Sequence, residues 1–104
     1  MSELPKPPKA YLDFVARHPK LGEAWSMLNE AGAEGPLDER TQRLVKLAIA
    51  VGAMREGAIR SNVRKARAIG IEVAEIEQVV ALAASTLGLP STVAVDSWIR
   101  SLVE

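Results

Sequence analysis

Apolar residues recur at intervals of three and four along most of the chain, which is the spacing of one face of an α-helix. The segment from Leu21 to Ala31 shows it clearly, because Ala24, Trp25 and Leu28 fall on the same face. Prolines and glycines separate the periodic segments and mark where helices begin and end. This pattern predicts an all-α bundle of about six helices, over residues 9–17, 19–31, 39–51, 56–69, 73–87 and 90–103.

The segment 44–51 reads Leu-Val-Lys-Leu-Ala-Ile-Ala-Val and is apolar on nearly all sides. A buried β-strand is the rival interpretation of such a run. Asp38 is a good N-cap, and residues 39–43 form a polar first turn in which Glu39 is well placed. These signals favour a helix, which we expect to be the central, buried helix of the bundle.

The N-terminal residues 1–8 are polar and contain Pro5, Pro7 and Pro8, which cannot lie inside a helix. We expect a flexible arm there, followed by a single helical domain over residues 9–104. Hydrophobic residues make up 48% of the chain, although 104 residues bury only a modest core by themselves. This surplus predicts burial against other copies of the chain, with Trp25 and Trp98 in the core or at that subunit interface.

Charge and residue types exclude several classes of function. The 13 basic and 13 acidic residues cancel, so nothing global attracts nucleic acid or an anionic membrane. No apolar run approaches the roughly 18–20 residues that span a bilayer, and the N-terminus is unlike a signal peptide, so we expect a cytoplasmic protein. The absence of cysteine excludes disulfides and thiolate chemistry. The single histidine, His18, is expected to be solvated or to cap a helix, so we expect no metal and no cofactor.

One segment imitates a helix-turn-helix, with residues 66–71 as the turn and basic residues before it. The recognition helix would then contain Glu75 and Glu77 but no lysine or arginine. Phosphate contacts need cations on that element, so DNA binding is disfavoured. We expect instead that the basic helix over 56–69 pairs with Glu72, Glu75 and Glu77, within or between subunits.

The segment 37–89 resembles the carboxymuconolactone decarboxylase and alkylhydroperoxidase D superfamily in an ordered series of features. The series is a helix cap, an alanine-rich apolar helix, a second helix that ends at a glycine, an acidic helix start and a Gly-x-Pro turn. These features stand at Leu37–Thr41, Leu47–Gly52, Arg55–Gly70, Glu72–Ile76 and Leu87–Pro90. The resemblance implies an alkylhydroperoxidase D-like fold and a homo-oligomer, as a dimer, trimer or hexamer.

The redox members of that superfamily carry Cys-x-x-Cys-x-x-x-His, with a glutamate twelve residues before the first cysteine. The resemblance places Arg55 and Ala58 at the cysteines, Asn62 at the histidine and Arg43 at the glutamate. Disulfide exchange needs an attacking and a resolving thiol, so thiol peroxidase or disulfide reductase activity is excluded. A cysteine-free branch reads Arg-Glu-Gly-Ala-Val-His-Ser-His here, and its two histidines are replaced by Arg60 and Asn62.

Four residues of this region are candidates for a site. Asn62 lies in an apolar stripe, where its amide either contacts a ligand or is satisfied by backbone carbonyls or water. Arg55 either anchors a substrate carboxylate or forms a structural ion pair, and Arg43 would add a second positive charge. Glu56 is the only candidate for proton transfer, although a helix-start charge or salt bridge is the simpler role.

Two functions remain open from the sequence. One is a non-redox, non-catalytic oligomeric relative of the decarboxylases. The other is a decarboxylase-like or lactone-handling enzyme that binds a small carboxylate between subunits. In the second, Arg55, Asn62 and Arg43 would hold the anion and Glu56 would move the proton.

Overall fold

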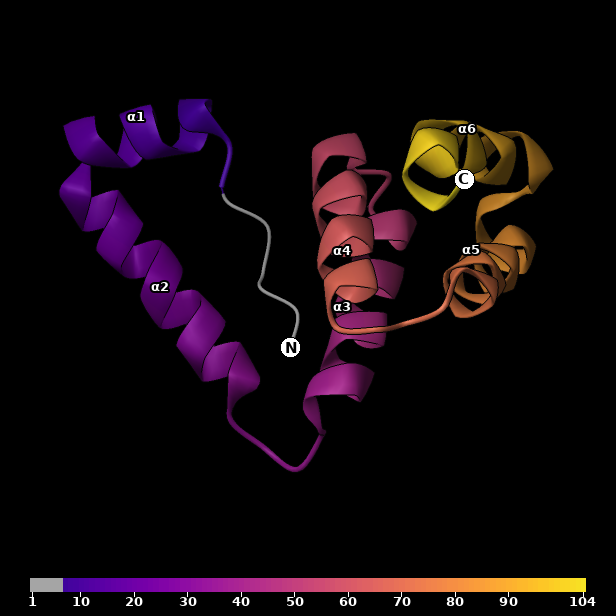
Figure 1. Ribbon diagram of the computed structural model, residues 1–104, viewed down its shortest axis with the longest axis horizontal. Helices are drawn as coiled ribbons and strands as arrows, with labels where there is room; N and C mark the ends of the chain where they lie inside the picture. The colour runs from indigo at the N-terminus through magenta and orange to yellow at the C-terminus, as the bar shows by residue number, and fades with distance from the viewer. Residues whose placement is uncertain (1–6) are drawn as a thin grey trace. The chain divides into compact units, whose positions relative to one another are not determined.

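The computed structural model describes residues 7–104 and contains six helices and no strand in that range (Figure 1). This confirms the predicted all-α fold and rejects the strand interpretation of residues 44–51. Residues 1–6 of the predicted N-terminal arm lie outside the described residues. The helices are α1 (Lys9–Arg17), α2 (Pro19–Ala33), α3 (Glu39–Gly52), α4 (Glu56–Ala68), α5 (Val73–Leu87) and α6 (Leu89–Val103).

The described chain falls into two compact units, one up to Leu37 and one from Asp38 to Glu104. The first unit is the hairpin of α1 and α2, and the second unit holds α3 to α6. A single domain over residues 9–104 stays a prediction.

The α1–α2 unit has no buried residue in either helix. Pro19 occupies the first turn of α2, as expected, and the Phe14 and His18 rings contact each other with centroids 4.7 Å apart. Gly22 allows a close approach, because a Cβ at that position would lie 3.1 Å from the Val15 Cβ. Trp25 is 54% exposed, so it forms no core within this unit, and its place at a subunit interface stays a prediction.

The core of the second unit lies among its four helices. Helix α3 packs against α4 and α5, and α6 packs against the same two helices. Most of its members are β-branched or leucine side chains that these helices direct inward. Trp98 is partly buried and packs against this core, as expected. The buried members are Leu47, Ala50, Val51, Ile59, Val63, Ala66, Ile71, Ile76, Val80, Val95 and Ile99.

Helix α3 begins at the predicted cap. The Thr41 backbone N–H donates to the Asp38 carboxylate at 2.7 Å, and this hydrogen bond lowers the pKa of Asp38. We expected α3 to be a buried helix that is apolar on nearly all sides. This expectation is wrong for the single chain, in which α3 is buried on one side only. Leu47 is fully buried, whereas Val45 and Ile49 are 42% and 65% exposed, because only one face of α3 meets α4 and α5.

The turn between α3 and α4 fixes how these helices face each other. The N–H groups of Met54 and Arg55 donate to the carbonyls of Val51 and Ala50, at 3.0 and 3.2 Å, which is a Schellman arrangement. Met54 takes the left-handed conformation, with φ 56°, where glycine is usual. Gly52 is the last residue of α3, one residue beyond the predicted end of this helix.

Acidic residues at the start of α5 pair with arginines from outside α4. Arg40 of α3 donates to Glu75, and Arg100 of α6 lies 3.2 Å from Glu77. The expected pairing of these carboxylates with the basic helix α4 is not seen among the described residues of one chain. Glu72 and Glu75 also form a capping box at the helix start.

Candidate functional site

The site begins with a contact between α3 and α4, which lie side by side in Figure 1. The Arg43 guanidinium donates through Nη1 to the Oδ1 atom of Asn62 at 2.9 Å. The Asn62 amide in turn donates through Nδ2 to the carbonyl of Ala58, also at 2.9 Å. Both halves of the Asn62 amide are therefore satisfied, by a cation on one side and by a backbone carbonyl on the other.

The positive charge of Arg43 lies in an environment that stabilises it poorly. The side chain is partly buried, and its Nε atom is buried without a hydrogen-bond partner among the described residues. Burial lowers the pKa of Arg43, and the nearby Glu39 charge only partly opposes this. No carboxylate of the described residues forms a salt bridge with Arg43, so its charge is balanced only by the Asn62 amide oxygen and the nearby Glu39 charge.

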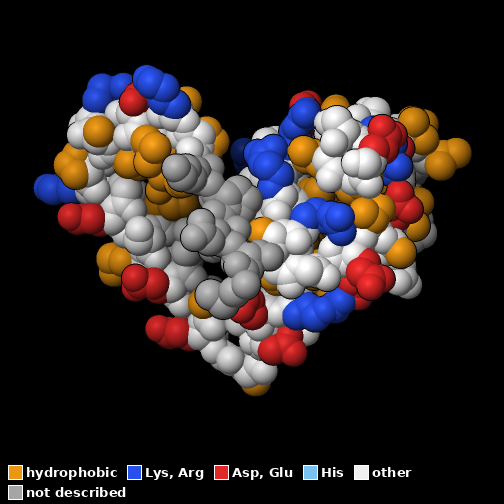
Figure 2. All heavy atoms as spheres, viewed as in Figure 1, with side chains coloured by type: hydrophobic (Ala, Val, Ile, Leu, Met, Phe, Trp, Pro, Cys, Tyr) orange, Lys and Arg blue, Asp and Glu red, His pale blue; other side chains and the backbone are white. Residues whose placement is uncertain are grey.

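Lys65 adds a second positive charge to the same region. It lies three residues after Asn62 on α4, so both residues share one side of the helix. Burial lowers the pKa of Lys65, and the positive charges of Arg43 and Lys46 lower it further. Figure 2 shows Lys and Arg side chains gathered over α3 and α4.

Arg55 lies just before α4. It is the N-cap residue of α4, with φ −95° and ψ 95°, and it is exposed. No described ion pair joins Arg55 to Glu56. The predicted site therefore has Arg43 and Asn62 in contact, whereas Arg55 belongs to the turn before the helix.

Glu56 is exposed in the first turn of α4 and lies 3.3 Å from Arg60, four residues later. This arrangement corresponds to the helix-start charge and salt bridge, the simpler of the two roles. A general acid near neutral pH usually depends on a desolvated setting, which Glu56 does not have within one chain.

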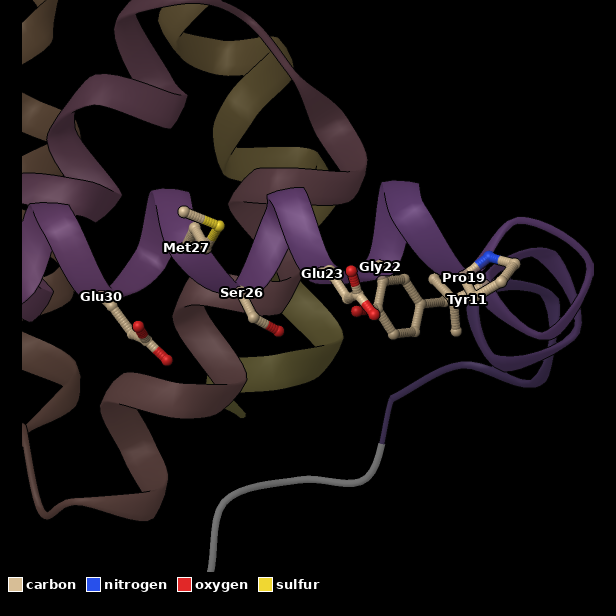
Figure 3. A pocket seen from close by; sticks show the side chains of 8 residues that line it. Tyr11, Pro19, Gly22, Glu23, Ser26, Met27 and Glu30 are labelled. Carbon is tan, nitrogen blue, oxygen red and sulfur yellow. The ribbon is translucent and has the colours of Figure 1, made fainter.

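A shallow hollow lies on the α1–α2 unit and has a volume of about 670 Å³. Figure 3 shows its lining along α2, with the Tyr11 ring from α1 and the carboxylates of Glu23 and Glu30. None of the four predicted site residues lines it. Two carboxylates and no lysine or arginine make it unsuited to a carboxylate ligand.

Two further features are absent from the part of the chain that the structure describes. No group of three or more His, Cys, Asp or Glu side chains there is arranged to hold a metal ion. No helix there has both the length and the apolar character needed to cross a membrane. His18 is exposed and makes no side-chain cap bond to α2, but its ring contacts Phe14.

Comparison with known proteins gave one match. The family model described as "Carboxymuconolactone decarboxylase family" matches residues 19–101, which covers most of the chain and runs through both units. Searches of curated proteins and of solved structures returned no match.

Proposed function

Because the chain belongs to the carboxymuconolactone decarboxylase family, we propose that it is a non-redox, oligomeric member without catalytic activity of its own. Cysteine is absent from the sequence, so no thiolate of this chain can attack a peroxide or a disulfide. By the resemblance, the residues at the glutamate and histidine positions of the redox members also differ in chemical type.

The Arg43–Asn62 hydrogen bond is the observation that carries this proposal. By the resemblance, these positions hold a glutamate and a histidine in the redox members. Here a permanent cation faces an amide, and neither group exchanges a proton near neutral pH. Arg43 and Asn62 are in contact across α3 and α4, but this contact is not an acid–base pair.

Exposed apolar side chains support the oligomeric part of the proposal. The α1–α2 unit buries none of its residues, and α3 exposes Val45 and Ile49 one turn apart. Large apolar side chains also reach the surface at α5 and α6 (Figure 2). Exposed apolar patches of this kind mark interaction surfaces in soluble proteins.

A two-part experiment tests this proposal. Light scattering at micromolar concentration should report a homo-oligomer, and a peroxidase assay with a dithiol reductant should show no turnover above buffer. A monomer in light scattering would contradict the proposal that the protein is an oligomer. Peroxidase turnover that survives further purification would contradict the proposal that it is not catalytic.

A second candidate function is a small-carboxylate-binding enzyme with its site between α3 and α4 of adjacent subunits. The partly buried Arg43 guanidinium favours it, because this cation forms no salt bridge with a described carboxylate and an anion would neutralise its charge. In this candidate Arg55 and Asn62 would help to hold the ligand, and Glu56 would transfer the proton. A thermal-shift screen with small mono- and dicarboxylates tests it: binding should raise Tm, and Arg55→Ala should abolish the rise.

A further inference from the structure

We infer that the hollow on the α1–α2 unit is a binding site for a linear polyamine, a chain of methylene groups that carries several ammonium groups. Its lining combines carboxylates with apolar and aromatic side chains and contains no lysine or arginine. The site shares no residue with the Arg43–Asn62 contact, and its ligand has the opposite charge to the carboxylate considered above. This inference goes beyond the proposed function and does not depend on it.

The hollow is negatively charged. Glu23 and Glu30 of α2 line it, and neither carboxylate forms an ion pair with a described lysine or arginine. In the same unit, Asp13 of α1 is neutralised by Lys9, whose Nζ lies 2.8 Å from the carboxylate. The two glutamates therefore leave the hollow with two uncompensated negative charges, which attract a cationic ligand.

The polar groups of the hollow form a row along one side of α2. Glu23, Ser26 and Glu30 are separated by three and four residues, and their side chains lie on the same side of the ribbon in Figure 3. Seven residues of α-helix rise by about 10.5 Å, which is close to the extended length of a triamine such as spermidine. One terminal ammonium can therefore reach Glu23 while the other reaches Glu30. The Ser26 hydroxyl between them can accept a hydrogen bond from the central ammonium.

Apolar and aromatic side chains line the hollow beside this row. Tyr11 and Val15 of α1 are half-buried, and Met27 of α2 is 68% exposed. The methylene segments between the ammonium groups can pack on these side chains, which removes apolar surface from water. An aromatic ring in the same hollow as the carboxylates adds a cation–π attraction for an ammonium group. An inorganic cation has no apolar segment, so this lining favours the polyamine.

The hollow lies on the opposite side of α2 from the exposed apolar stripe of that helix. Leu21, Trp25 and Leu28 form this stripe and are 54%, 54% and 66% exposed. At about 100° per residue, the stripe and the row from Glu23 to Glu30 are centred roughly 170° apart around the helix. Burial of the stripe against another copy would therefore leave the hollow open, so the polyamine site is compatible with the proposed oligomer.

The test is an NMR titration of the isotope-labelled full chain with spermidine, in which the backbone amide shifts are followed. We expect saturable shifts at Glu23, Ser26 and Glu30. Putrescine, which is too short to reach both carboxylates, and Mg²⁺ at the same ionic strength should each bind more weakly than spermidine. Glu23→Gln and Glu30→Gln should each weaken spermidine binding about two- to fivefold, the size expected for one exposed ion pair.

Glu34→Gln is the matched control, because it removes an exposed carboxylate at the end of α2 that does not line the hollow. It should leave spermidine binding unchanged, and circular dichroism should show that every variant keeps its helices. Shifts that do not saturate, or equal affinity for spermidine and putrescine, would overturn the inference. Equal spermidine binding by the wild type and by the double variant Glu23→Gln/Glu30→Gln would overturn it as well. None of these results bears on the light-scattering and peroxidase measurements that test the proposed function.

Discussion

The Arg43–Asn62 contact makes a prediction about stability that a double-mutant cycle measures. The cycle consists of the wild type, Asn62→Ala, Arg43→Met and the double variant. In Asn62→Ala, Arg43 loses its acceptor at 2.9 Å while its charge stays partly buried. In Arg43→Met, the buried charge is removed together with the hydrogen bond, and the alkyl packing is largely kept.

The magnitudes follow from these contacts. A hydrogen bond to a charged group contributes about 1.5–3 kcal/mol, and partial exposure favours the lower end of that range. The higher helix propensity of alanine offsets up to about 0.7 kcal/mol of this loss. Asn62→Ala should therefore lower the free energy of unfolding by about 1–2 kcal/mol. Arg43→Met should lie within about 1 kcal/mol of the wild type, because desolvation of the charge is relieved. The coupling energy of the pair should then be about 1–2 kcal/mol.

Urea unfolding followed by far-ultraviolet circular dichroism provides the four free energies of unfolding. All four proteins must be compared at one concentration, because self-association stabilises the folded state. Helix propensity cancels in the cycle, so the coupling reports the side-chain contact itself. A coupling energy below about 0.3 kcal/mol, the usual error of additivity, would show that this hydrogen bond contributes nothing to stability.

Three further predictions concern the fold. Leu47→Ala should lower the free energy of unfolding by about 2–5 kcal/mol in urea titrations, since Leu47 is fully buried. Gly70→Ala should cost about 1–2 kcal/mol in the same assay, because Gly70 has φ 89° at the end of α4. Asp38→Asn should make the protein less sensitive to acid, as followed by helicity against pH. The lowered pKa of Asp38 means that its stabilising contribution is complete above pH about 3.9 and is lost as the pH falls through the folded-state value.

Matched variants make these three predictions sharper. Ile49→Ala changes an exposed residue on the same helix as Leu47 and should cost less than about 0.5 kcal/mol in a monomer, so a weakened oligomer would locate Ile49 in the interface. Gly57→Ala lies inside α4 with open space around it and should stabilise, opposite in sign to Gly70→Ala. If both variants of a matched pair lost the same free energy of unfolding, the packing described here would be contradicted. An acid transition that is unchanged in Asp38→Asn would contradict the capping of α3.

The sequence predicted the helices well because their signals are local. The proline at Pro19, the cap at Asp38 and the positive-φ glycine at Gly70 each act within one turn of chain. Burial was harder to predict, because α3 carries apolar residues on nearly all of its sides, whereas only one side packs against neighbouring helices. Pattern alone cannot tell a side chain in the core, such as Leu47, from one on a surface that awaits a partner, such as Ile49.

One contact of the candidate site was foreseen from the sequence, while the site itself stays a prediction. Asn62 was placed in the apolar stripe of α4 next to α3, and Arg43 was placed in the same region, and these two side chains do form a hydrogen bond. Arg55 precedes α4, as the predicted helix over 56–69 implied, and its role in a site stays a prediction. The partial burial of Lys65 was not predicted, because an isolated lysine on a helix is usually solvated.

The turn at Met54 determines which residues of the two helices can meet. Arg43 comes before this turn and Asn62 comes after it, so the closure of the turn brings the two side chains into contact. One residue inserted within the first turns of α4, between Gly57 and Asn62, would rotate Asn62 and every later position of the helix by about 100° about its axis. Asn62 and Lys65 would then leave Arg43 together, even though no residue that touches the guanidinium had been altered.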